Sequence, residues 1–96
     1  MTHRTVHVRI TGRVQGVSYR AWTEAAAAQL NLRGWVRNRR DGSVEAVFSG
    51  TGEAISDMLR RCHGGPPAAR VEQVVATDRP AGDDLPKAFE FRPTTE

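Results

Sequence analysis

The hydrophobic residues near the start of the chain recur with a period of two. Val6, Val8 and Ile10 alternate with polar residues across positions 3–11, a pattern typical of a strand with one face buried. Shorter or less regular patterns of the same kind occur further along the chain. We predict further strands at residues 33–40, 43–49 and 70–77, an acidic loop at 80–86, and a short last strand around Phe89 and Phe91.

Asp41 and Gly42 separate two of these strands. An Asp-Gly pair between alternating apolar residues is a strong signal for a tight turn, because glycine readily adopts the positive φ that such turns need. We therefore expect the flanking strands to pair antiparallel. On the first of them, Val36 and Asn38 share one face of the sheet, so a polar amide lies on the same side as an apolar side chain.

Two other stretches have helical periodicity. Residues 19–30 include an alanine-rich run with high helix propensity, and residues 50–63 are followed by Gly64, which is a helix stop signal. Ser18 stands directly before the first helix, and we expect its hydroxyl to cap a free N–H there. The apolar positions that define the two buried faces are Tyr19, Trp22, Ala26 and Leu30 in the first helix, and Ile55, Met58, Leu59 and Cys62 in the second.

The elements follow one another in the order βαββαβ, with the short extra strand at the C-terminal end. This order predicts an α+β fold of the ferredoxin-like type, in which two helices cover one face of an antiparallel sheet. We expect a single domain, 1–96, because 96 residues are too few to bury a second core. The fold supports many functions, so it does not define one by itself.

The segment between the first strand and the first helix has the features of an anion site. A helix N-terminus has unpaired backbone N–H groups and a partial positive charge, and Gly16 allows the backbone to approach a ligand closely. Arg20 lies in the first helical turn, where its charge is unfavourable unless an anion lies beside it. By spacing alone, a solvated surface arginine that happens to open a helix is the more common alternative. A phosphate would bind the free N–H groups and the guanidinium together. For Asn38, the residues alone favour a polar side chain near a strand end over a functional one.

Charge alone leaves the type of ligand open. The 14 basic and 11 acidic side chains give a net charge of +3, which suits either a nucleic acid or a small anionic substrate. Several arginines gather around Asn38, and either a solvated strand face or electrostatic steering of a substrate would account for them. These arginines are Arg33, Arg37, Arg39 and Arg40.

Other classes of site and location find no support in the sequence. Cys62 is the only cysteine, so no internal disulfide can form and we expect a reducing, cytoplasmic location. The three histidines lack metal-ligand spacing, and we expect neither a metal nor another cofactor. The chain lacks an apolar stretch of about 18 residues and the hydrophobic region of a signal peptide, so we expect no membrane insertion.

Three runs of residues carry a resemblance to a known family. Gly-Arg-Val-Gln-Gly-Val-Ser-Tyr-Arg at 12–20 is followed by Gly-Trp-Val-Arg-Asn at 34–38 and Asp-Gly-Ser-Val at 41–44. In this order and at this separation the runs resemble the acylphosphatases, and the similarity extends from the first strand to Phe91. The family has a variable, often aromatic, position where this chain has Ser18.

The resemblance implies a monomeric enzyme that hydrolyses acyl phosphates without a metal or a covalent intermediate. It implies that Arg20 is the catalytic arginine and that Asn38 is the catalytic asparagine. Inorganic phosphate would be both a product and an inhibitor. The backbone N–H groups that would bind the phosphoryl group are those of Gln15, Gly16, Val17, Ser18, Tyr19 and Arg20.

The side chains of the loop agree with such a substrate. The loop lacks a cysteine nucleophile, and with no metal site or general acid in evidence, positioning and electrostatic stabilisation are left to accelerate the reaction. A carboxylate is a weak base that departs without a proton, whereas a phosphate monoester must expel an alkoxide. Two other classes remain as alternatives. One is a regulatory anion-binding module without turnover, and the other is a ferredoxin-like RNA-binding module. Because the first strand lacks the aromatic residues on which RNA bases stack, we expect no nucleic-acid partner.

Overall fold

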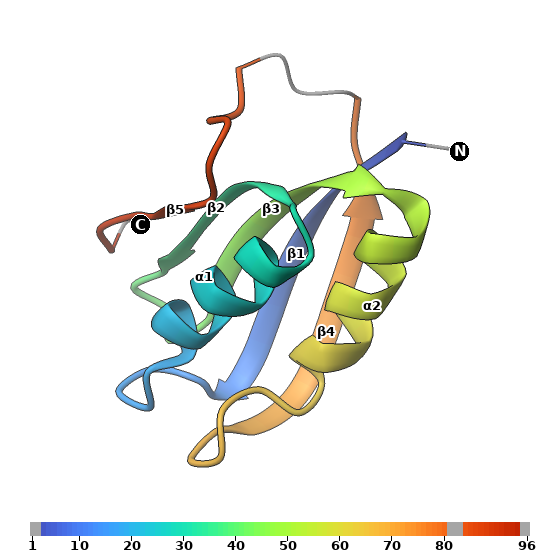
Figure 1. The fold of residues 1–96 in the computed structure, drawn as a ribbon. Helices are drawn as coiled ribbons and strands as arrows, with labels where there is room; N and C mark the ends of the chain where they lie inside the picture. Colours follow the sequence, from blue (N-terminus) through green and yellow to red (C-terminus); the bar gives the residue numbers. More distant parts are fainter. Residues whose placement is uncertain (1–2, 81–83, 95–96) are drawn as a thin grey trace.

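The computed structural model describes residues 3–80 and 84–94 and consists of one layer of helices packed on one sheet (Figure 1). The predicted α+β arrangement is confirmed. Of the acidic loop predicted at residues 80–86, positions 81–83 lie outside the described residues. The elements in chain order are β1 (His3–Arg13), α1 (Tyr19–Gln29), β2 (Arg33–Asn38), β3 (Val44–Thr51), α2 (Gly52–Cys62), β4 (Arg70–Asp78) and β5 (Glu90–Phe91).

The sheet has the strand order β4-β1-β3-β2-β5, with β1 between β3 and β4. The pairs β1–β3, β1–β4 and β2–β3 are antiparallel, as predicted. β5 instead runs parallel to β2, with Val36 opposite Phe91, so the sheet is mixed and not wholly antiparallel. The chain path explains this difference. β4 finishes at the end of the sheet where β2 begins, and β5 lies at the opposite edge, so a direct crossing starts β5 in the direction of β2 (Figure 1).

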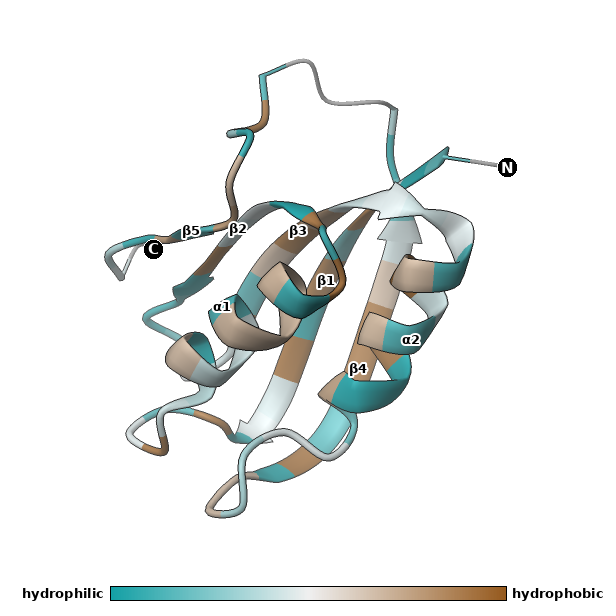
Figure 2. Ribbon diagram, viewed as in Figure 1, coloured by the Kyte–Doolittle hydropathy of each residue, from teal (hydrophilic) through white to brown (hydrophobic). Residues whose placement is uncertain are grey.

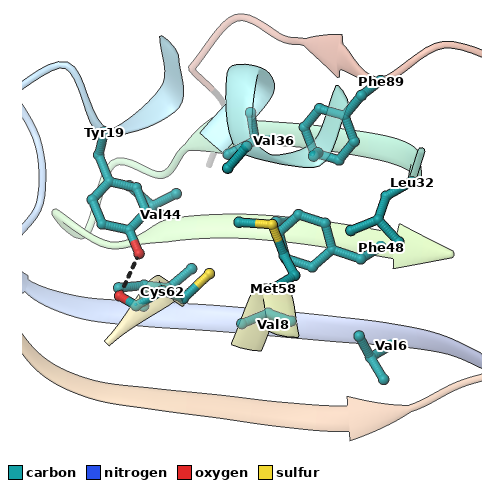
Figure 3. Close-up of a cluster of buried hydrophobic side chains, with 14 of the residues drawn as sticks. Val6, Val8, Tyr19, Leu32, Val36, Val44, Phe48, Met58, Cys62 and Phe89 are labelled. Carbon is teal, nitrogen blue, oxygen red and sulfur yellow. Dashed lines mark hydrogen bonds between the residues drawn. The ribbon is translucent and has the colours of Figure 1, made fainter. Parts of the chain in front are cut away.

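The two helices bury the apolar face of the sheet, which contains the hydrophobic positions of β1 and β3 (Figure 2). Val6, Val8 and Ile10 are fully buried, as their alternation predicted. Phe48 of β3 is also fully buried, and Phe89 stacks on it with a centroid distance of 5.4 Å (Figure 3). The helical residues that are buried in this core are Tyr19, Ala26, Ala27, Ile55, Met58 and Cys62, with Trp22, Leu30 and Leu59 partly buried against it.

Within the described part of the chain, neither helix has the length and apolar character that crossing a membrane requires. Both α1 and α2 have 11 residues. A transmembrane helix needs about 20 residues, because the hydrocarbon core of a bilayer is about 30 Å thick.

Candidate active site

The loop between β1 and α1 makes a sharp turn. Gly16 has a φ of 73° and Ser18 a φ of 66°, so both adopt the left-handed region. Glycine does this without strain, whereas a residue with a Cβ carries a cost of roughly 1–2 kcal/mol, and such strain tends to occur at functional sites. The turn therefore suggests that the backbone of the loop is held in a special conformation for a ligand.

The prediction that the Ser18 hydroxyl caps α1 is wrong. Ser18 occupies the N-cap position, but its side chain makes no capping hydrogen bond. A capping residue is normally extended, and the left-handed backbone of Ser18 does not present its side chain to the first turn in that way. The first N–H groups of α1 thus lack the cap that usually satisfies one of them, and they are available to an anion.

A pocket of about 410 Å³ is lined by residues from the start of α1 and the end of β2. These two parts of the chain lie side by side in Figure 1. It brings together side chains from the loop, from α1, from β2 and from β5. All but one of the predicted site residues contribute to it. The exception is Val17, whose side chain is buried in the core. The lining residues are Val14, Gln15, Gly16, Ser18, Tyr19, Arg20, Ala21, Asn38 and Phe91.

The guanidinium of Arg20 is held by the C-terminal segment. Its Nη1 donates a hydrogen bond to the carbonyl oxygen of Arg92 at 3.1 Å, and its Cζ lies 4.3 Å from the centroid of the Phe91 ring. Across residues 3–80 and 84–94, no carboxylate forms an ion pair with Arg20. The guanidinium is therefore oriented without being neutralised, which suits an anionic ligand. Neither Phe91 nor Arg92 was predicted from the sequence to contribute to this site.

Asn38 reaches the same pocket from the end of β2, opposite Val44 of β3. Val36, two residues earlier, is fully buried under the helices, so the predicted sharing of one face by Val36 and Asn38 is confirmed. The apolar face of the sheet thus ends in an amide at the point where α1 begins. Arg20 and Asn38, which are far apart in the sequence, line one pocket.

Tyr19 connects the site to the core. Its hydroxyl donates a hydrogen bond to the backbone carbonyl of Cys62 at 2.7 Å, which joins the start of α1 to the end of α2 (Figure 3). Burial raises the pKa of Tyr19 well above its usual value, and burial also raises the pKa of the Cys62 thiol to about 11. Both groups stay protonated at neutral pH, so the structure gives Cys62 the part of a core residue and not of a nucleophile.

The open face of the sheet carries a cluster of charged side chains next to Asn38. Glu45 of β3 is only 7% exposed, and it accepts hydrogen bonds from Arg37 at 2.8 Å and Arg39 at 3.1 Å. Its second oxygen lies 2.6 Å from Nε2 of His7. Burial raises the pKa of Glu45, but the hydrogen bonds from His7, Arg37 and Arg39 and the charge of Arg37 outweigh burial and hold it below its usual value.

These contacts change the interpretation of the arginine cluster. Arg37 and Arg39 bind Glu45, and Arg33 donates to the carbonyl oxygens of Leu85 at 2.6 Å and Pro86 at 3.3 Å. The three side chains therefore make specific structural contacts at the start of β2 and around its end, which neither a solvated face nor steering alone had predicted.

We expect Glu45→Gln to lower the free energy of unfolding at pH 7 by about 2 kcal/mol, because a buried charged acceptor is lost. The pKa of Glu45 is lowered in the folded state, so its contribution is present above the usual glutamate pKa and disappears as the pH falls through the lowered value. The difference between the two proteins should shrink in acid. Thermal unfolding at a series of pH values from about 7 to 3 measures this difference in stability.

Asp78→Asn is the matched control for this experiment. The Asp78 side chain is 76% exposed and pairs with Arg4 at 3.0 Å, so its loss should cost less than about 1 kcal/mol. A stability difference for Glu45→Gln that stays constant down to pH 3 would contradict the assignment.

The fold and the pocket define a class of protein. Free N–H groups at a helix start, an oriented guanidinium and an amide in one pocket are the groups that bind and stabilise a phosphoryl group. On a ferredoxin-like sheet they make a small phosphoryl-binding enzyme domain. The sequence profile that matches this chain is that of acylphosphatase, over residues 6–91. The chain belongs to the acylphosphatase family.

Individual relatives agree with this membership. The acylphosphatase of Rhodopseudomonas palustris is 62% identical over 69 residues, which cover 72% of this chain and 70% of that protein. The acylphosphatase of Bradyrhizobium diazoefficiens is 52% identical over 84 residues, covering 88% and 83% respectively. The solved structure of an acylphosphatase from Coxiella burnetii superposes with a TM-score of 0.89 at 33% identity, covering 94% of this chain and 93% of that one.

Proposed function

We propose that this acylphosphatase hydrolyses the carboxyl–phosphate bond of small acyl phosphates in the pocket at the start of α1. One observation carries the proposal: Arg20 and Asn38, from different elements, line the same pocket as the loop before α1. Water attacks phosphorus, the bond between phosphorus and the acyl oxygen breaks, and the electron pair leaves with the carboxylate. The products are the carboxylate and inorganic phosphate.

The phosphoryl group binds to the loop and to Arg20. The backbone N–H groups of residues 15–20 and the guanidinium of Arg20 contact the three phosphoryl oxygens. Charge spreads over these oxygens in a loose transition state, so oriented donors stabilise the transition state more than the ground state. Because Arg20 is already fixed by Arg92 and Phe91, little reorganisation is needed when the substrate binds.

Asn38 orients the attacking water. Its amide both donates and accepts hydrogen bonds, so it can hold a water molecule in line with the leaving oxygen. None of the described residues that line the pocket is a carboxylate, a histidine or a lysine. The proton of the water therefore passes to a phosphoryl oxygen in our proposal. The same lining favours direct attack by water, because the hydroxyl of Ser18 has no neighbouring base to activate it.

The RNA-binding alternative finds little support on the open face of the sheet. Trp35 is only 9% exposed, and the guanidinium groups of Arg37 and Arg92 lie 4.5 and 5.2 Å from the centroid of its ring. A covered tryptophan offers no stacking surface to a base. Phe91 is 44% exposed, but it lies against Arg20 in the pocket.

We propose a cytoplasmic monomer that acts on a small substrate and is inhibited by inorganic phosphate.

We expect the protein to hydrolyse benzoyl phosphate, and this activity should survive EDTA and extensive dialysis. In the described part of the chain no group of three His, Cys, Asp or Glu side chains could hold a metal ion. A phosphate monoester such as p-nitrophenyl phosphate should react far more slowly, because its leaving group is a stronger base. Loss of activity on chelation, restored by a divalent ion, would overturn the metal-free proposal. Phosphate binding without any hydrolysis would instead favour the regulatory anion-binding module.

A further inference from the structure

The side chain of Gln15 joins the two halves of the pocket. Its amide nitrogen donates to the carbonyl oxygen of Arg39 at 2.7 Å and to that of Ser43 at 2.9 Å. A primary amide has two N–H donors, so both are used in these bonds. The loop that precedes α1 is thereby connected directly to the β2–β3 hairpin, which carries Asn38.

The two acceptors lie at the base of that hairpin. The N–H of Arg39 donates to the carbonyl of Ser43 at 2.9 Å, and the N–H of Gly42 donates to the carbonyl of Arg39 at 3.2 Å. A carbonyl oxygen can accept two hydrogen bonds, so the Gln15 bonds add to the bonds of the turn. Arg39 follows directly after Asn38. Its backbone carbonyl is held by Gln15 and its side chain by Glu45, so the chain next to Asn38 is fixed by two separate contacts.

We propose that Gln15 is a positioning residue for hydrolysis. It sets the separation between the phosphate-binding loop and Asn38, and so aims the attacking water at phosphorus. The inference rests on the proposed function, in which Asn38 orients that water. The Gln15 side chain thus has a role distinct from that of the Gln15 backbone N–H. A substitution at this position removes the side-chain amide but leaves the backbone N–H in the loop.

The geometry makes this separation sensitive to Gln15. Asn38 is the last residue of β2, and the hairpin turn begins two residues later at Arg40, so the regular strand supports Asn38 only on its N-terminal side. A displacement of about 1 Å in a reacting group can lower a rate by about a hundredfold. Arg20, the charged group that binds phosphate, does not depend on this connection, because it is held by Arg92 and Phe91 instead. Loss of the Gln15 amide should therefore affect turnover more than phosphate binding.

Gln15→Met tests the inference, because it keeps the length of the side chain and removes both donors. We expect kcat for benzoyl phosphate to fall by about tenfold. The inhibition constant for inorganic phosphate should change by less than about twofold. Gln73→Met on β4 is the matched control, since Gln73 is exposed and does not line the pocket, and its kcat should equal that of the wild type.

A double-mutant cycle with Asn38→Ala separates positioning from a general structural effect. If Gln15 acts through Asn38, Gln15→Met should lower kcat by less than about twofold in the Asn38→Ala background. An equal loss in both backgrounds would overturn the inference, as would a normal kcat for Gln15→Met alone. A loss of phosphate inhibition in Gln15→Met would also overturn it, because the loop itself would then be disturbed. The effect of Asn38→Ala by itself tests the proposed function. A failure of the proposed function can therefore be distinguished from a failure of the inference about Gln15.

Gln15→Glu provides a second readout, which also serves if Gln15→Met is too unstable to assay. The introduced carboxylate repels both carbonyl oxygens, whereas its protonated form can donate one hydrogen bond. The kcat of Gln15→Glu relative to the wild type should therefore rise as the pH falls. The ratio for Gln15→Met should stay flat over the same range. A flat ratio for Gln15→Glu would count against the positioning role.

Discussion

Replacement of Arg20 by lysine is expected to lower kcat/KM for benzoyl phosphate by about a thousandfold. Lysine keeps the positive charge but loses the planar guanidinium, which can donate to two phosphoryl oxygens while a third N–H holds the carbonyl of Arg92. It also loses the stacked contact with the Phe91 ring, so the charge would no longer be fixed in the pocket. The effect of the substitution should therefore appear both in substrate binding and in turnover.

Inhibition by inorganic phosphate measures the binding part of this loss. We expect the inhibition constant of Arg20→Lys to rise, while the thermal unfolding temperature stays near that of the wild type. Arg60→Lys is the matched control, because the Arg60 side chain is 74% exposed and pairs with Asp57 in its own helix. Near-normal kinetics and unchanged phosphate inhibition in Arg20→Lys would remove Arg20 from the site.

Asn38→Ala is expected to lower kcat by about a hundredfold and to leave the affinity for phosphate nearly unchanged. A neutral amide adds little to the binding of a dianion beside a guanidinium and a row of N–H groups. It can, however, fix the direction of a water molecule, and an interaction made mainly in the transition state appears in kcat. Single-turnover kinetics measure the effect on the chemical step, and phosphate inhibition measures the effect on phosphate affinity.

Asn38→Asp is an informative comparison, because it keeps the shape of the side chain and adds a negative charge. We expect the aspartate to weaken phosphate binding through repulsion, whereas the alanine should not. Thermal unfolding of both variants shows whether the hairpin remains intact. If folded Asn38→Ala loses phosphate inhibition altogether, Asn38 is a ligand of the phosphate and the water-orienting role is wrong.

Most of the fold could be predicted from local pattern, and the exceptions have identifiable causes. Alternation placed β1 correctly because its two faces have different environments, with Val8 in the core and Arg9 exposed. The facing of Val74 and Val75 could not be decided from spacing. In the structure Val74 lies opposite Ile10 and packs on the core, and Val75 is exposed. A register shift between Thr11 and Gly12 adds a residue to the β4 side, so Val71 and Val74, three positions apart, both pack on the core.

The functional site, like the fold, could be predicted in part from the sequence. A local argument made the anion-binding loop and Arg20 candidates, because a helix start has its own chemistry, but the catalytic role of Arg20 came from the family resemblance. The resemblance to the acylphosphatases, and not the residue pattern, identified Asn38. The contacts of Arg92 and of the Gln15 side chain were beyond prediction, since each depends on the packing of segments that are distant in sequence. The Arg20–Arg92 bond spans 72 positions and the Gln15–Arg39 bond spans 24.

The position of β1 within the sheet has a consequence for the rate at which the chain folds. Its register places His3 opposite Thr51 and Val6 opposite Asp78, so both neighbours of β1 come from much later in the chain. Of the strand pairs in the described part of the chain, only the β2–β3 hairpin can form by closing a short loop. Chains dominated by such long-range pairing fold in milliseconds to seconds, because closure entropy is lost before the contacts form. The pocket draws on the loop after β1, on α1, on β2 and on β5 together, so we expect catalytic activity to return late in refolding, after the hairpin has formed.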